Sequence, residues 1–77
     1  MAKGILRALG EELRERRQNR KLTQDELAAR VGLHRNYIGM LERGERNPTV
    51  AILEAIAPVL RCSLSEFFAG IERRQRP

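Results

Sequence analysis

The sequence is poor in the residue types that cross-link a small protein. Cys62 is the only cysteine and His34 the only histidine among the 77 residues, and tryptophan is absent. An internal disulfide needs a second cysteine, and a structural zinc site draws about four ligands mostly from Cys and His. Both are therefore excluded within this chain. We expect Cys62 to fill a gap beside the core as a reduced thiol, and we expect no cofactor and no metal.

Long apolar runs are also missing. No run approaches the ~20 residues that a membrane span requires, and the N-terminus lacks the apolar segment of a signal peptide. A chain of 77 residues is long enough for one small domain with a single modest core. We expect one domain over residues 1–77, located in the cytoplasm and without a membrane partner.

The residues that catalysis needs are scarce. The chain has one aspartate, Asp25, and its carboxylates form no evident pair for acid and base work. The spacing of Gly39 and Gly44 matches part of a phosphate-binding loop, but Glu45 and Arg46 follow where Lys and Ser or Thr are required. We therefore do not expect an enzyme.

Basic residues are present in excess. Fifteen Lys and Arg oppose ten Asp and Glu, which gives a net charge of +5 and a pI near 10.7. Such a basic domain favours a polyanionic partner, above all nucleic acid. The charge is not concentrated, because residues 1–21 hold seven basic and three acidic groups, residues 22–47 four of each, and residues 48–77 four and three. Any selectivity must then come from individual side chains.

Apolar periodicity predicts an all-α fold of five helices and no strand. The expected helices cover approximately residues 4–20, 24–31, 34–43, 50–60 and 64–71, followed by a basic and disordered tail at residues 72–77. In the first helix Leu6, Leu9 and Leu13 form the buried stripe. Arg17 continues this stripe, with a long stem that can cover the edge of the core.

The second and third helices are predicted to form a helix-turn-helix. Thr23, followed three residues later by Glu26, is a capping box that starts the second helix. Gly32 can adopt the positive φ of a sharp turn, and the third helix begins near His34. Two short helices joined by so few residues are typical of this motif. His34 is expected to cap the third helix or to contact a phosphate.

The third helix has an apolar face and an unusual outer face. At 100° per residue, Ile38 and Leu41 point toward the core. The outer face then carries Asn36, Met40 and Arg43, flanked by Arg35 and Gly39. A glycine inside a helix costs about 1 kcal/mol relative to alanine, and a solvated methionine exposes an apolar thioether. This face is therefore predicted to contact a partner.

The major groove of B-DNA matches the chemistry of this outer face. The groove admits an α-helix; arginine bonds guanine bidentately, asparagine bonds adenine, and an apolar tip meets the thymine methyl group. Arg35, Asn36 and Met40 supply these three chemistries. Gly39 would let the helix backbone approach the base edges. We predict that these four residues read DNA bases.

The last two helices also carry start signals. Thr49 is expected to cap the fourth helix, and Ser63 with Glu66 forms a second capping box. Pro58 lies inside the fourth helix, where it removes a backbone donor and collides with the preceding turn. A kink or early fraying of this helix is therefore predicted.

The fifth helix has more apolar residues than a small monomer needs. Phe67 and Phe68 are adjacent, so both cannot face inward on one helix. Part of the group Phe67, Phe68 and Ile71 is therefore predicted to form a twofold homodimer interface, with the identity of the core phenylalanine left open. The alternative is that both phenylalanines close the monomer's own core.

Residues 13–68 resemble the repressor/Cro-type helix-turn-helix family, also called XRE-like. The run GLHRNYIGMLERGERNP is most similar to the controller proteins of bacterial restriction–modification systems. The resemblance implies a compact five-helix bundle of the phage-repressor DNA-binding type. It implies a bacterial or phage protein at the nucleoid, which binds a palindromic operator in double-stranded DNA as a homodimer. It also implies activation or repression of promoters, with RNA polymerase as a further partner.

The resemblance also assigns roles to individual residues. Gln24 matches the family's phosphate-contacting glutamine at the start of the second helix. The base-reading positions correspond to Arg35, Asn36, Gly39 and Met40, with Tyr37 beside them. The end of the recognition helix and the following loop, which grip the DNA backbone, correspond to Arg43, Arg46 and Asn47. Tyr37 is expected to be partly buried with its hydroxyl toward the DNA, and Glu42 to pair with a nearby arginine.

A second class of function fits the same sequence. An antitoxin or an adaptor of this fold would have a protein partner as its main ligand, and the exposed aromatic residues would meet that partner. Tight binding of one operator by the isolated protein favours the regulator. Tight binding only to a co-encoded protein favours the alternative.

Overall fold

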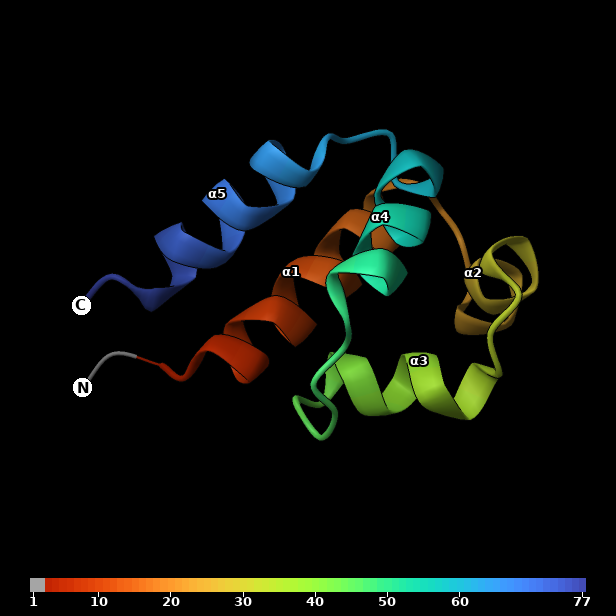
Figure 1. Cartoon of the computed structure of the whole chain (residues 1–77), viewed down its shortest axis with the longest axis horizontal. Helices are drawn as coiled ribbons and strands as arrows, with labels where there is room; N and C mark the ends of the chain where they lie inside the picture. The colour runs from red at the N-terminus through yellow and green to blue at the C-terminus, as the bar shows by residue number, and fades with distance from the viewer. Residues whose placement is uncertain (1–2) are drawn as a thin grey trace.

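The computed structural model describes residues 3–77, which contain five helices and no strand. The helices are α1 (Ile5–Asn19), α2 (Gln24–Val31), α3 (Arg35–Glu42), α4 (Val50–Val59) and α5 (Leu64–Gln75). Helices α1 and α5 lie side by side, so that the start of α1 and the end of α5 share one end of the molecule (Figure 1). Helices α2 and α3 pack against each other away from that end. The predicted all-α fold is confirmed.

Four of the five helices are capped at their N-terminus by a side chain that accepts a hydrogen bond from a backbone N–H of the first turn. The Thr23 hydroxyl accepts from the Glu26 N–H at 3.0 Å, and the Glu26 carboxylate accepts from the Thr23 N–H at 2.8 Å. Ser63 and Glu66 repeat this reciprocal pair at the start of α5. Thr49 caps α4 through the backbone N–H of the third residue that follows. Both predicted capping boxes and the Thr49 cap are confirmed.

The turn between α2 and α3 depends on one glycine. Gly32 has a φ of 70°, in the left-handed region that costs glycine little, and it ends α2. The backbone N–H of Leu33 then donates to the carbonyl of Ala28 at 2.9 Å, which closes the end of the helix. Leu33 packs against the core, and α3 starts two residues later at Arg35.

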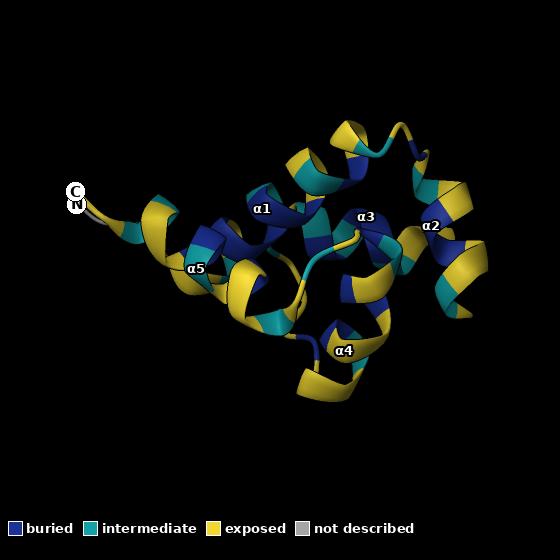
Figure 2. Cartoon of the chain, turned by 90° about the horizontal axis from the view of Figure 1, so that it is seen from above, coloured by how far each residue is buried: buried dark blue, intermediate teal, exposed yellow. Residues whose placement is uncertain are grey.

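The core is formed where the helices face one another. Its buried residues come from every helix, as the dark blue positions of Figure 2 show. Cys62 packs against its edge, and burial raises the pKa of this thiol, as expected for a gap-filling cysteine. Helix α4 ends at Val59, one residue after Pro58, and its end is closed by backbone hydrogen bonds from Leu60 to Ile56 at 3.2 Å and from Cys62 to Ala57 at 3.1 Å, so the predicted fraying is not observed. No helix within residues 3–77 has the length and apolar character needed to cross a membrane.

The structure corrects the predicted dimer interface. Phe67 and Ile71 are each only 1% exposed and belong to the monomer's own core. They cannot supply a surface to a second copy. Phe68, on the adjacent helix position, is 36% exposed, and its ring lies edge-on to that of Phe67. The interface prediction is therefore kept for Phe68 alone.

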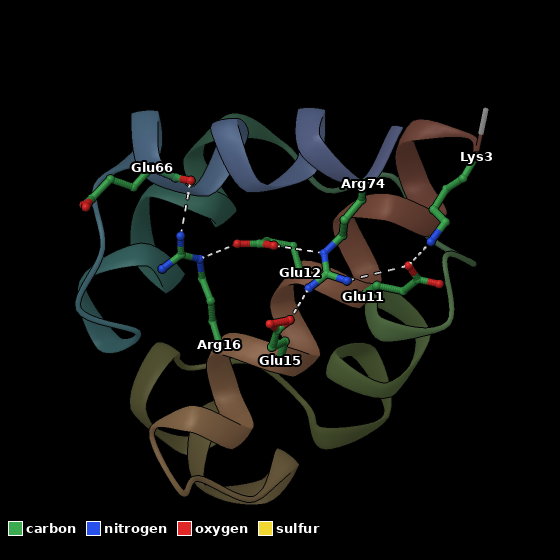
Figure 3. A network of polar contacts seen from close by, with 7 residues as sticks. All are labelled: Lys3, Glu11, Glu12, Glu15, Arg16, Glu66 and Arg74. Atoms are coloured by element: carbon green, nitrogen blue, oxygen red, sulfur yellow. Dashed lines mark hydrogen bonds and ion pairs between the residues drawn. The ribbon is translucent and has the colours of Figure 1, made fainter. Parts of the chain in front are cut away.

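The structure also corrects the predicted C-terminal tail. Helix α5 continues through residues 72–75 to Gln75, because Arg74 is anchored on α1. Its guanidinium donates to Glu12 at 2.9 Å and to Glu15 at 2.6 Å (Figure 3). Glu12 also accepts from Arg16 at 2.6 Å, so its buried carboxylate has a cationic partner on both sides. These pairs join the last turn of α5 to the middle of α1.

Candidate nucleic-acid interface

A buried ion pair fixes helix α3 to α1. Arg17 donates from Nε and Nη2 to the Glu42 carboxylate at 2.6 and 3.0 Å, and from Nη1 to the Leu22 carbonyl at 2.7 Å. The side chains are only 10% and 4% exposed. The predicted pairing of Glu42 with an arginine is confirmed. Because every polar atom of this bidentate pair is satisfied, it sets the position of the end of α3.

Two further contacts hold α3 in place. The Gln24 side-chain Nε2 donates to Glu42 at 3.0 Å, which ties the first residue of α2 to the last residue of α3. The backbone of α1 also approaches α3 closely at Gly10. A Cβ atom added there would lie 2.5 Å from the carbonyl oxygens of Leu41 and Glu42. A side chain at this position would therefore push the two helices apart.

An open concavity lies between the start of α2 and the outer face of α3, and we call it the α2–α3 concavity. Its lining residues are Gln24, Arg35, Asn36, Gly39, Met40, Arg43 and Glu45. Six of these seven residues are among the predicted DNA contacts. The fold thus brings Gln24 of α2 beside side chains of α3 that lie at least 11 residues further along the chain.

The predicted base-reading side chains are accessible. Arg35 and Asn36 are exposed, and Met40 is half-buried. Arg35 lies 3.8 Å from the Asp25 carboxylate, an exposed and loose ion pair. Arg46 reaches from the following loop toward Met40, with its Nε 3.4 Å from the sulfur. The apolar tip of Met40 therefore has a cation beside it.

Gly39 differs from its expected environment. The sequence predicts an open backbone at this position, but Gly39 is buried because the Arg43 side chain folds over it. A Cβ atom at Gly39 would lie 3.1 Å from Arg43 Nη1 and 3.8 Å from the Gln24 side chain. Direct approach of another molecule to the Gly39 backbone first requires that Arg43 move.

The remaining predicted contact residues lie outside the lining of the concavity. The His34 Nδ1 accepts from the Asn36 N–H at 3.1 Å, so His34 is the cap of α3. Tyr37 is half-buried and packs against the core, as expected. Arg46 and Asn47 are exposed in the segment between α3 and α4.

Three residues of this region were not anticipated from the sequence. Gly10 sets the distance between α1 and α3, and Asp25 and Glu45 hold arginines of the concavity. A local signal existed only for Glu45, which lies two residues after Arg43 across a glycine. The hydrogen bond from Arg43 lowers the pKa of the Glu45 carboxyl, so it is charged at neutral pH.

Comparison with known proteins places the chain in a family. The helix-turn-helix family matches residues 13–67. Control protein C.SmaI of Serratia marcescens is 38% identical over 73 residues, which cover 92% of this chain and 87% of that protein. Control protein C.MunI of a Mycoplasma species is 38% identical over 58 residues, which cover 75% of this chain and 78% of that protein.

Solved structures agree with these relatives. The restriction–modification controller protein C.Esp1396I, crystallised as a tetramer with its natural 35 base-pair operator, superposes with a TM-score of 0.83 at 30% identity, covering 94% of this chain and 95% of that chain. The clp gene regulator ClgR of C. glutamicum superposes with a TM-score of 0.92 at 24% identity, covering 99% and 97%, which supports the fold alone. The chain therefore belongs to the helix-turn-helix family of DNA-binding transcriptional regulators, and restriction–modification controller proteins are among its relatives.

Proposed function

We propose that this regulator works as a homodimeric controller that binds a palindromic operator through the α2–α3 concavity. The observation that carries this proposal is the convergence of Gln24, Arg35, Asn36 and Met40 on one accessible surface. These side chains can form bidentate hydrogen bonds, amide hydrogen bonds and apolar contacts with base edges. An α-helix such as α3 also fits the major groove. The operator-bound tetramer of C.Esp1396I, a relative of similar size, supports operator binding.

In the proposed complex, α3 enters the major groove and the following loop contacts the DNA backbone. Arg35, Asn36 and Met40 read base edges, whereas Gln24, His34 and Tyr37 contact phosphates or sugars from the sides. Arg43, Arg46 and Asn47 grip the backbone beyond the end of α3. Two copies related by a twofold axis place their recognition helices about 34 Å apart, which matches half-sites roughly 10 base pairs apart.

The dimer contact is proposed at Phe68 on the outer side of α5. This ring is the exposed member of the phenylalanine pair, and its helix is held rigidly on α1 by Arg74. Sedimentation of the wild type at micromolar concentration is expected to show a dimer, and Phe68→Ser is expected to shift it toward monomer. A wild type that sediments only as a monomer refutes the dimer.

The proposed regulation follows from where the operator lies relative to a promoter. Protein bound to an operator that overlaps the promoter blocks RNA polymerase, and protein bound to an operator beside the promoter recruits it. The protein then acts on nucleoid DNA in the bacterial cytoplasm. Selection of bound sites from random duplex DNA should return one palindromic sequence. Recovery of no preferred sequence, together with tight binding only to a co-encoded protein, would favour a protein-binding module instead.

Two substitutions separate base reading from backbone binding. Arg35→Ala is expected to cost about 1–3 kcal/mol on the selected operator and to relax the preference at one guanine. Arg46→Ala is expected to weaken binding to all duplexes alike and to reduce the slope of log affinity against log salt concentration by about 1. Titration of operator and mutated duplexes over a salt series measures both effects. Undiminished sequence discrimination in Arg35→Ala would show that the base-reading assignment is wrong.

A further inference from the structure

One acidic side chain lies among the groups proposed to bind DNA. Glu45 accepts from Arg43 Nε at 3.0 Å and from Arg43 Nη2 at 3.2 Å, which is a bidentate pair. The same guanidinium covers Gly39. Carboxylate and phosphate both bind the planar guanidinium group in this bidentate manner. Glu45 therefore occupies Nε and Nη2, two of the donor atoms with which Arg43 could bind a DNA phosphate.

The backbone holds Glu45 in this position. Gly44 has a φ of 75°, and the Glu45 N–H donates to the Met40 carbonyl at 2.9 Å. A Cβ atom at Gly44 would lie 3.1 Å from the Arg7 Cα, so the turn is packed directly on α1. The carboxylate is thus attached to a fixed point at the end of α3, two residues from its partner arginine.

Fold stability does not account for this pair. The Arg43 and Glu45 side chains are 59% and 52% exposed. Exposed ion pairs contribute little to stability, because water screens the attraction and ordering two long side chains costs entropy. The buried Arg17–Glu42 pair already fixes the end of α3. The effect of Glu45 must then be on the affinity of the α2–α3 concavity for its partner.

We propose that Glu45 is an internal competitor for DNA phosphate: it holds Arg43 over Gly39 and lowers the affinity of the recognition surface for duplex DNA. This inference rests on the proposed function. DNA binding requires that Arg43 exchange Glu45 for a phosphate, and the displaced carboxylate stays near a polyanion that repels it. Both effects weaken binding of the protein to any DNA sequence. Glu45 therefore raises the protein concentration that is needed to occupy an operator.

The sign of the effect separates this role from two others. If Glu45 oriented Arg43 for base reading, its loss would weaken operator binding. If the carboxylate itself accepted from a cytosine amino group, its loss would also weaken operator binding. The competitor role alone predicts that binding becomes tighter. Glu45→Gln removes the charge while preserving the shape, and Glu45→Ala also releases Arg43.

The test compares three variants of the full chain with the wild type. Fluorescence anisotropy titrations use the operator recovered by selection and a scrambled duplex of equal length, over a series of KCl concentrations. Glu54→Gln is the control, because Glu54 is an exposed residue of α4 outside the concavity and its loss changes the net charge equally. Urea unfolding of each variant verifies that the fold is kept.

We expect Glu45→Gln and Glu45→Ala to bind both duplexes about fivefold or more tightly at low salt, from removal of one close like-charge contact. The steepness of the salt dependence should rise by up to about 1, because the carboxylate no longer offsets one of the positive charges that neutralise phosphates. Glu54→Gln should change affinity much less. Equal or weaker binding by both Glu45 variants overturns this inference alone. A wild type that binds neither duplex overturns the proposed function and this inference with it.

Discussion

Gly10 provides a quantitative test of how α3 is positioned. In Gly10→Ala the new Cβ would lie 2.5 Å from two backbone carbonyl oxygens at the end of α3. Backbone cannot rotate away, so α1 and α3 must separate. Overpacking of this kind costs about 1–3 kcal/mol, and an obstacle made of backbone favours the upper end of that range. Replacing glycine by alanine inside a helix returns about 0.5–1 kcal/mol. The expected net loss is about 2 kcal/mol.

Gly39→Ala is the matched control within another helix. Its Cβ would lie 3.1 Å from the end of the flexible Arg43 side chain, which can move. The gain in helix propensity, about 0.5–1 kcal/mol, should then dominate. The two glycine-to-alanine substitutions are therefore expected to change stability in opposite directions.

Thermal and urea unfolding followed by circular dichroism at one protein concentration measures both variants. A loss of about 2 kcal/mol in a domain of this size lowers the Tm by roughly 8–16 °C. Equal concentrations are needed because the proposed homodimer would raise the apparent stability as the protein concentration rises. A Gly10→Ala protein that is as stable as the wild type would refute the close helix contact and the positioning of α3 that depends on it.

Two further perturbations address the ion pair and the caps. Glu42→Ala leaves Arg17 buried without its carboxylate and is expected to cost about 3–5 kcal/mol in urea unfolding; a loss below about 1 kcal/mol would contradict the buried pair. Backbone hydrogen bonds at the capping boxes lower the pKa of Glu26 and Glu66 below the ordinary 4.5. Their contribution is complete above that value and is lost as the pH falls through the folded-state pKa. The double variant Glu26→Gln/Glu66→Gln should therefore lose less stability on acidification than the wild type, and an identical pH profile would argue against the boxes.

The short-range sequence pattern determined where most helices begin and where the turn lies. Thr23 with Glu26, Ser63 with Glu66, and Gly32 act within one helical turn. Their hydrogen bonds join residues that are at most five positions apart, so sequence spacing is sufficient to predict them. The outer face of α3 was predictable for a similar reason, because the helical repeat alone separates it from Ile38.

Interactions between distant residues were not predictable in this way. The adjacent phenylalanines show it most simply, because periodicity indicates that one must face outward but not which one. Packing of α5 on α1 turns Phe67 inward and leaves Phe68 exposed. The same packing brings Arg74 to Glu12, 62 positions away, which extends α5 through residues that the sequence predicts as a tail.

The sequence by itself therefore determined where most helices begin, the turn between α2 and α3, and the chemistry of the outer face of α3. The tertiary structure decided how α3 is held and what covers it: the backbone contact at Gly10, the buried Arg17–Glu42 pair, and the fold of Arg43 over Gly39. The physical reason is the range of the interactions. Caps and helix faces follow from bonds within a turn, whereas close approach and charge pairing depend on the distance and angle between whole helices, which only the packed core sets.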